Sequence, residues 1–214
     1  MTAIPDAEEL AVTTTDGVRL EAEYVLPALA RPGALVVLCH PHPLHGGTMR
    51  SLVISSLFAS LPTENVAAVR FNFRGVEGSQ GTHGGGGPEA TDVLAVLDAA
   101  DDLAPGACRV VVGWSFGADV ALQVHDPRVA GWVAIAPPLR FGREFSAVAG
   151  DVRPKLFVLA QHDEVREPAS VVAEVGSWRS TTVETVPGAS HFFVGRTDRV
   201  HAHVAGFVRE LATA

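Results

Sequence analysis

VVVGWSFGADVAL, residues 110–122, is the stretch of sequence that decides the fold. It begins as an apolar run, reaches Ser115 between Gly113 and Gly117, and continues as a helix-like segment. Where a strand turns sharply into a helix around a serine, only small residues fit two places either side of it. Such a turn holds the hydroxyl at the head of the helix, where free backbone N–H groups stabilise a developing oxyanion. The stretch therefore predicts a nucleophilic serine on a strand-to-helix turn.

Strand-like and helix-like segments alternate along the rest of the chain, which is typical of a mostly parallel sheet with helices on both faces. The first two strands, joined by the hairpin signal Asp16-Gly17, are expected to be antiparallel. In all we expect eight strands, near residues 9–14, 18–26, 34–39, 66–71, 109–113, 129–135, 155–160 and 181–186. The expected helices lie near residues 52–61, 88–103, 116–124, 170–178 and 197–211. The segment 137–154 is short for a lid domain.

Length and composition fit one globular domain over residues 1–214. The chain has 16 Lys and Arg against 24 Asp and Glu, and the resulting net charge of −8 disfavours a nucleic-acid partner. Early acidic residues argue against a leader and no apolar run reaches 18 residues, so we expect a cytoplasmic protein that binds no membrane. Cys39 and Cys108 fall in predicted buried strands, and we expect no disulfide. The sequence leaves the oligomeric state open, including a homodimer.

Two further reactive side chains follow predicted strands at the same edge of the sheet as Ser115. In an open parallel sheet, reactive groups gather at the carboxyl ends of the strands. Asp163 comes just after the seventh predicted strand and His191 just after the eighth. The chain order serine, aspartate, histidine is expected for a nucleophile on such a turn, with the histidine as base and the aspartate holding its tautomer. Glu164 stays open as an alternative acid.

Histidine and proline alternate in residues 40–43, directly after the third predicted strand, where the second oxyanion donor is expected. The two prolines have no N–H, so the predicted donors are the backbone N–H groups of His42 and Phe116. A metal site formed by three histidines of this loop is an alternative, because imidazole binds zinc and similar ions. No acidic residue accompanies them locally, so we expect no metal and no cofactor. The three histidines are His40, His42 and His45.

Three segments occur in a characteristic order: CHPHPLHGGTM (39–49), RFNFRGVEGSQG (70–81) and GWSFG (113–117). With them the chain resembles the α/β-hydrolase superfamily, and more narrowly the small bacterial hydrolases with a His-Pro-His-Pro loop, related to dienelactone-hydrolase-like enzymes. The resemblance implies the α/β-hydrolase fold with an eight-stranded, mostly parallel sheet and no large lid domain. It also implies Ser115 as nucleophile, Asp163 as acid and His191 as base. The chain departs from the pattern of the family at two positions. Dienelactone hydrolases use cysteine where this chain has serine, and Glu77 stands where many superfamily members have glycine.

Together these residues predict a serine hydrolase that cleaves carboxylic esters of short or medium acyl chains through an acyl-enzyme intermediate. Its partner is a small acyl substrate, held in an open, shallow pocket below the glycine-rich loop 84–87. For the apolar residues assigned to this pocket, ordinary core packing is the competing explanation. The predicted pocket residues are His40, Trp114, Leu139, Phe141, Phe145 and Phe192.

Other functions fit the same residues. A thioesterase or small peptidase would use the same catalytic triad, and a cofactor-free perhydrolase or haloperoxidase would replace water with peroxide. A non-catalytic binding module is a further alternative, because a fold does not fix a function.

Overall fold

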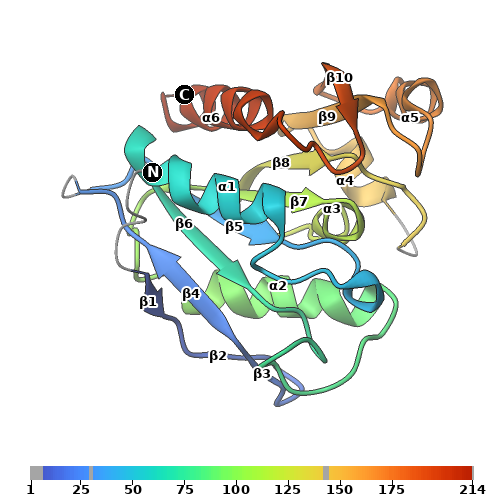
Figure 1. Ribbon diagram of the computed structural model, residues 1–214. Helices are drawn as coiled ribbons and strands as arrows, with labels where there is room; N and C mark the ends of the chain where they lie inside the picture. The colour runs from blue at the N-terminus through green and yellow to red at the C-terminus, as the bar shows by residue number, and fades with distance from the viewer. Residues whose placement is uncertain (1–6, 29–30, 142–144, 214) are drawn as a thin grey trace.

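The largest element of the structure is an eight-stranded sheet (Figure 1). The structure is a computed structural model that describes residues 7–28, 31–141 and 145–213. The strands of the large sheet are β1 (Glu8–Glu9), β4 (Ala22–Val25), β5 (Ala34–Cys39), β6 (Val66–Phe71), β7 (Cys108–Trp114), β8 (Val129–Ile135), β9 (Lys155–His162) and β10 (Thr181–Ser190). Their order is β1-β4-β6-β5-β7-β8-β9-β10. The pairs β1–β4 and β4–β6 are antiparallel and the other pairs are parallel.

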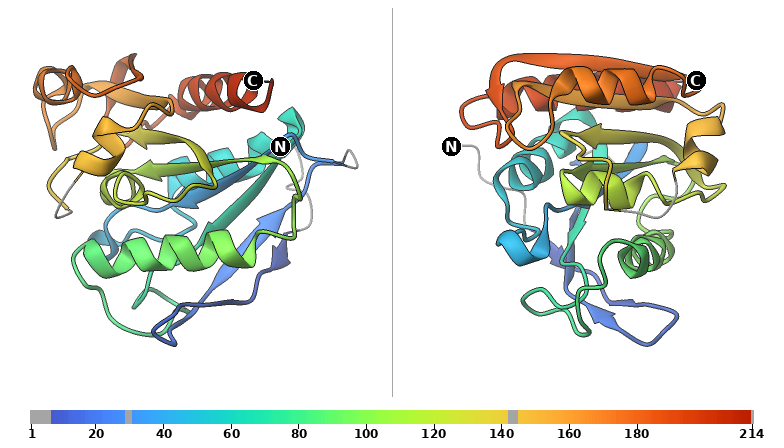
Figure 2. Two further views of the ribbon diagram at one scale, coloured as in Figure 1. Left: turned by 180° about the vertical axis from the view of Figure 1, so that it is seen from behind. Right: turned by 90° about the vertical axis from the view of Figure 1, so that its right-hand side faces the viewer.

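Helices cover both faces of this sheet, as the opposite views in Figures 1 and 2 show. One face carries α1 (Leu52–Ser60) and α6 (Thr197–Thr213). The other carries α2 (Gly87–Ala99), α3 (Phe116–Ala121), α4 (Ser146–Gly150) and α5 (Pro168–Val175). Successive residues of β5 enter opposite cores, Leu35 on the α2 side and Val36 on the α1 side. A strand buried on both faces reads as a continuous apolar run, and the observed sheet confirms the predicted fold class.

The N-terminal hairpin is shorter and more divided than predicted. The expected strands near residues 9–14 and 18–26 become four short strands, of which β1 and β4 join the large sheet. The other two, β2 (Val12–Thr13) and β3 (Arg19–Leu20), pair only with each other in a second sheet. Val12 and Leu20 are buried in the core beside α2, and this packing bends the hairpin away from the large sheet.

The helices also differ from the prediction in their ends. Two of them, α2 and α3, end at Ala99 and Ala121, several residues before the predicted ends, and the five-residue α4 was not predicted. Helix α4 buries only Val148, too little apolar periodicity for a sequence pattern to reveal. In the ranges that the structure describes, no helix has both the length and the apolar composition needed to cross a bilayer.

One edge of the sheet collects the loops that carry the site. The strands β5, β7, β9 and β10 are mutually parallel and end at Cys39, Trp114, His162 and Ser190. Each of these strand ends leads directly into one residue singled out in the sequence. Those residues are His40, Ser115, Asp163 and His191.

Candidate active site

Ser115 lies on the sharp turn between β7 and α3, with backbone angles φ 55° and ψ −120°. A non-glycine residue at such a φ is strained and persists only where its surroundings hold it. The Ser115 N–H donates to the carbonyl of Ile135 at 2.8 Å. A Cβ on Gly113 would lie 2.1 Å from the Gly117 carbonyl oxygen, and one on Gly117 would lie 2.2 Å from that of Cys39. The two glycines therefore let strand, helix and the loop after β5 approach closely enough to hold the turn.

The imidazole of His191 lies between Ser115 and Asp163. Its Nε2 is 2.9 Å from Ser115 Oγ, and its Nδ1 is 2.9 and 3.0 Å from the two carboxylate oxygens of Asp163. Because an ionised carboxylate only accepts hydrogen bonds, Nδ1 carries the proton and Nε2 accepts from the serine hydroxyl. The side chains of His191 and Asp163 are only 5% and 4% exposed, so little water competes for these bonds. This arrangement can activate the serine hydroxyl as a nucleophile.

The backbone of His191 is held at both of its polar atoms. Its N–H donates to the Glu164 carboxylate at 3.1 Å, and its carbonyl accepts the indole N–H of Trp114 at 3.2 Å. Glu164, the alternative acid, thus contacts the main chain of His191, while Asp163 contacts the imidazole. Trp114 was predicted only as a pocket wall. Its hydrogen bond joins residues 77 apart, and no sequence pattern indicates such a contact.

His40 is buried within the loop after β5 and does not line the cavity beside Ser115. Its Nδ1–H donates to the carbonyl of Pro41 at 2.7 Å, and its Nε2 accepts the N–H of Phe73 at 3.0 Å. Burial lowers the pKa of His40 to about 4, so the ring is neutral near pH 7. The prediction that His40 lines the pocket is wrong, because these two hydrogen bonds hold its ring inside the loop. Both of its ring nitrogens are engaged, so the set His40, His42 and His45 does not fit a metal site.

The peptide between Pro41 and His42 is fixed by the same hydrogen bond, because its carbonyl is the acceptor. A Cβ on Gly47 would lie 2.1 Å from this oxygen, so the loop closes tightly around it. In a trans peptide the N–H points away from the carbonyl, and within the described residues no acceptor for the His42 N–H is found. The N–H of Phe116, in the first turn of α3, has no partner inside the helix. The rings of His42 and Phe116 have centroids 5.0 Å apart, so the two predicted oxyanion donors belong to neighbouring residues.

A cavity of about 390 Å³ opens beside Ser115 and His191. Of the residues predicted to line it, Trp114, Phe141 and Phe192 do so. Eight residues that were not predicted as site residues also line it, and they come from three separate segments: residues 41–52 after β5, the segment after β8 and the loop after β9. These are Pro41, His45, Gly46, Gly47, Ser51, Leu52, Arg140 and Val165.

Three other parts of the predicted pocket lie elsewhere. Leu139 is 9% exposed and packs into the core on the α2 side. Phe145 packs against the same core, where its ring centroid is 6.1 Å from that of Trp178. The loop 84–87 is not part of the cavity lining, because Glu89 accepts two of the loop's N–H groups and holds it against the start of α2. For Leu139 and Phe145, core packing was the correct explanation.

Asp119, fully buried on α3, anchors the segment that follows β8. Its carboxylate accepts the backbone N–H groups of Leu139, Arg140 and Phe141 at 2.8, 2.7 and 2.8 Å. Burial raises the pKa of Asp119 to about 6, while the three N–H donors oppose that rise. Leu139 has a positive φ of 51°, a strained angle that these hydrogen bonds hold in place. The wall of the cavity that carries Arg140 and Phe141 is thus tied to the helix that begins after Ser115.

The ring of His42 lies within an aromatic cluster next to the nucleophile. The centroids of His45, His83 and Phe141 lie 4.8, 5.1 and 4.7 Å from its own. Partial burial lowers the pKa of His42, and so do the neighbouring His83, His45 and Arg140. Protonation of His42 is therefore disfavoured.

Glu77 occupies a backbone conformation that glycine adopts more easily than other residues. Its φ is +43°, in the left-handed region that glycine adopts without cost. The Glu77 carboxylate accepts a hydrogen bond from the Asn72 side chain at 2.9 Å and lies 3.5 Å from the Arg50 guanidinium. These contacts offset the strain of the turn after β6, and they give Glu77 a structural explanation.

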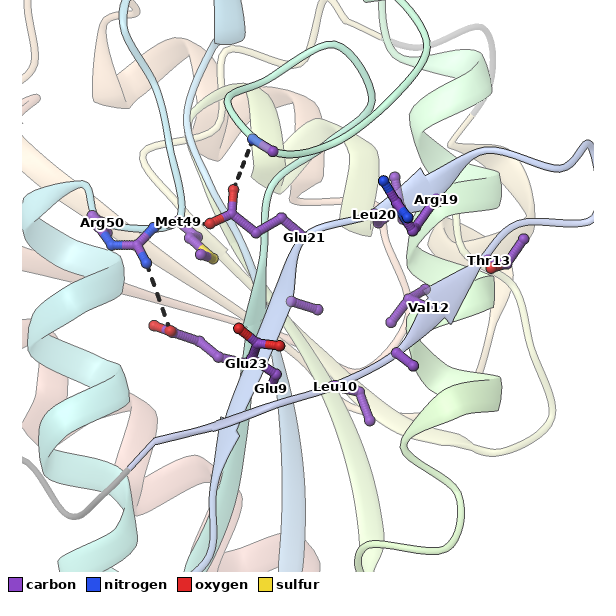
Figure 3. Close-up of a pocket in the computed structure, with 13 residues that line it drawn as sticks. Glu9, Leu10, Val12, Thr13, Arg19, Leu20, Glu21, Glu23, Met49 and Arg50 are labelled. Carbon is purple, nitrogen blue, oxygen red and sulfur yellow. Dashed lines mark hydrogen bonds and ion pairs between the residues drawn. The ribbon is translucent and has the colours of Figure 1, made fainter.

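A second hollow, of about 550 Å³, lies over β1 to β4 (Figure 3). Its lining includes none of the three residues of the predicted triad. Three of its charged groups pair with one another, since Arg50 lies 3.5 and 3.7 Å from Glu21 and Glu23. Glu21 also accepts the N–H of Gly78. The cavity beside Ser115 is therefore the better candidate for a reaction site.

The chain is similar in sequence to known proteins, and solved structures share its fold. No protein-family model matches the chain. The solved structure of an α/β serine hydrolase homologue from Coxiella burnetii matches with a TM-score of 0.81 over 96% of this chain and 98% of that one, and the two sequences are 32% identical. A serine hydrolase without a lid from Xanthomonas campestris is 27% identical, with a TM-score of 0.84 over 96% and 94% of the two chains. An uncharacterized protein of Rickettsia prowazekii is 29% identical over 84% of this chain and 80% of its own length.

Proposed function

Because the chain belongs to the α/β-hydrolase superfamily, we propose that it is a serine hydrolase that cleaves carboxylic esters of short or medium acyl chains. One observation carries the proposal. The hydrogen bonds from Ser115 through His191 to Asp163 join three side chains from three strand ends in an order that supports nucleophilic catalysis.

In the proposed mechanism, Ser115 attacks the acyl carbonyl while His191 Nε2 takes the hydroxyl proton. Asp163 stabilises the imidazolium that forms. His191 then gives its proton to the leaving alcohol, and the serine is left as an acyl ester. Water, deprotonated by the same Nε2, attacks this ester, and the carboxylic acid departs as Ser115 recovers its proton. Bonds and protons balance over the two half-reactions without a cofactor.

The tetrahedral intermediates carry a negative charge on the former carbonyl oxygen. We assign its stabilisation to the backbone N–H groups of His42 and Phe116. Two features support this assignment: the fixed peptide between Pro41 and His42, and the position of Phe116 in the first turn of α3. Donors that are held before the reaction cost no reorganisation when the charge develops.

The cavity supports an acyl chain of limited length. Its volume of about 390 Å³ lies near the lower end of the range usual for small-molecule sites. Its apolar walls include Trp114, Phe141 and Phe192, and Phe192 is 52% exposed at the surface. Aromatic walls of this kind favour an apolar acyl or aryl group.

Labelling with a neutral fluorophosphonate tests the nucleophile directly. We expect the native chain to be labelled in one-to-one stoichiometry and Ser115→Ala not to be labelled. Ser51→Ala is the matched control, because Ser51 also lines the cavity but has no hydrogen bond to an imidazole among the described residues. Labelling that persists in Ser115→Ala would overturn the assignment. Hydrolysis of matched ester and thioester substrates of increasing acyl length then defines the preference.

A further inference from the structure

We propose that Arg140 makes the site selective for esters that carry a carboxylate on their acyl or alcohol part. The inference rests on the proposed function, because it assigns the substrate class of that same site. Arg140 lines the cavity beside Ser115.

The cavity carries the opposite sign of charge from the protein as a whole. The chain has a net charge of −8, yet none of the described residues that line the cavity is an aspartate or glutamate. Besides His191, its ionisable lining residues are His42, His45 and Arg140. Since protonation of His42 is disfavoured, the permanent charge of the wall is that of the guanidinium.

Arg140 is presented from a fixed point. Asp119 holds the backbone N–H groups of residues 139–141, so the side chain starts from an anchored turn. Its guanidinium carbon lies 4.9 Å from the ring centroid of Phe141, which itself lines the cavity. Stacking on an aromatic face restricts the guanidinium without using its N–H donors, which remain available to a ligand.

Among the described residues, the Arg140 guanidinium has no carboxylate partner. Other arginines have one: Arg166, whose guanidinium also bonds to the Pro138 carbonyl near this wall, pairs with Glu174 at 2.6 Å. Arg74, buried beyond β6, pairs with Asp16 and Asp92. An arginine with free donors beside an apolar cavity is suited to a carboxylate, whose two oxygens match its planar fork.

The test uses three pairs of probes, and each pair is a carboxylate and its methyl ester. The first pair is a fluorophosphonate with a terminal carboxylate and its methyl ester, for which the rate of Ser115 modification is measured. The second pair, 4-nitrophenyl hemisuccinate and its methyl ester, places the charge on the acyl part, and the third, 4-butyryloxybenzoate and its methyl ester, places it on the alcohol part. For these two pairs kcat/KM is measured. We expect the native protein to prefer the anionic member in at least one arm, and the preference to weaken as salt is added.

In Arg140→Gln we expect the ratio of anionic to neutral rates to fall by about tenfold to a hundredfold, the usual effect of losing a charge-assisted hydrogen bond. Arg140→Lys should keep part of the preference, because it keeps the charge but loses the fork. Arg209→Gln is the matched control: Arg209 is an exposed arginine that pairs with Glu64 instead of lining the cavity. In Arg209→Gln the ratio of anionic to neutral rates should equal that of the native protein.

The outcomes separate this inference from the proposed function. If both members of each pair react at Ser115 but the native protein shows no anionic preference, or Arg140→Gln keeps it, the inference is overturned and the proposed function stands. If no probe modifies Ser115 and no ester is cleaved, the proposed function fails and the inference fails with it. Circular dichroism of Arg140→Gln checks that the exposed substitution leaves the fold intact.

Discussion

Asp163 and Glu164 are neighbours in sequence but contact different atoms of His191. Asp163 lies at the imidazole Nδ1, whereas Glu164 accepts the backbone N–H. In Asp163→Asn the amide can donate to Nδ1, which favours the tautomer with its proton on Nε2, so we expect kcat to fall about a thousandfold or more. In Glu164→Gln the amide oxygen still accepts the N–H, and we expect a loss within about tenfold.

Steady-state hydrolysis of a 4-nitrophenyl ester by the two variants measures this difference. The variants form a matched pair, because each replaces one carboxylate of the same loop by its amide. A larger loss in Glu164→Gln than in Asp163→Asn would assign the acid to Glu164 and contradict our choice.

At the residue scale, the sequence predicts site residues that directly follow a strand. It does not predict which residues tertiary hydrogen bonds place in the cavity or turn away from it. Ser115 and His191 follow strand ends, a rule that depends only on local patterns. Arg140 has no such pattern, because its place in the cavity depends on the Asp119 anchor and a strained Leu139. His40 stands in the same motif as His42 and was assigned to the pocket, but its two hydrogen bonds turn it inward.

At the element scale, the turn between β7 and α3 depends on the absence of a side chain at Gly113. A Cβ there would meet the carbonyl of Gly117 at 2.1 Å and the N–H of Ala118 at 2.4 Å, and neither backbone atom can move cheaply. We expect Gly113→Ala to lower the free energy of unfolding by about 3 kcal/mol or more and to reduce labelling of Ser115.

Gly206 offers the matched control, because it lies inside α6 with nothing within 4 Å of an added Cβ. Gly206→Ala should raise the free energy of unfolding by about 0.5–1 kcal/mol, through the better helix propensity of alanine. Urea unfolding followed by tryptophan fluorescence measures both variants. A Gly113→Ala variant as stable as the native protein would mean that the turn relaxes without strain.

The elements themselves could be predicted where burial sets a simple period. The central strands lie between two helical layers, so their continuous apolar runs predict β5 to β9. The pattern does not predict the divided N-terminal hairpin, since Val12 and Leu20 leave the sheet to pack beside α2. Helix α4 was missed because it is too short for a period of 3.6 residues to appear.

At the scale of the whole molecule, the sheet brings distant segments to one edge, and His40 ties two of them together there. Its Nδ1–H holds the loop after β5, and its Nε2 accepts from Phe73 in the segment after β6. The ring is fully buried, and burial lowers its pKa to about 4, below its ordinary value of about 6.5. The fold as a whole therefore depends on a neutral imidazole.

This burial predicts a loss of stability in acid. Between about pH 6.5 and pH 4 the unfolded chain binds a proton at residue 40 and the folded chain does not, so acid favours unfolding. The loss is complete only below the folded pKa and amounts to about 3 kcal/mol. In His40→Gln this titration is absent. We therefore expect the free energy of unfolding of the native protein, relative to that of the variant, to decrease as the pH is lowered from 7.5 to 4.

Urea unfolding of both proteins at several pH values in this range measures the effect, and the other titrating groups cancel in the difference. Asp119 illustrates why the comparison is needed: its raised pKa of about 6 gives stability that is present in acid and lost as the pH rises, the opposite sign. If the difference in free energy of unfolding between the native protein and His40→Gln stays constant with pH, then residue 40 binds its proton equally in the folded and unfolded states. The buried, neutral imidazole would then be the wrong description of the link between the two loops.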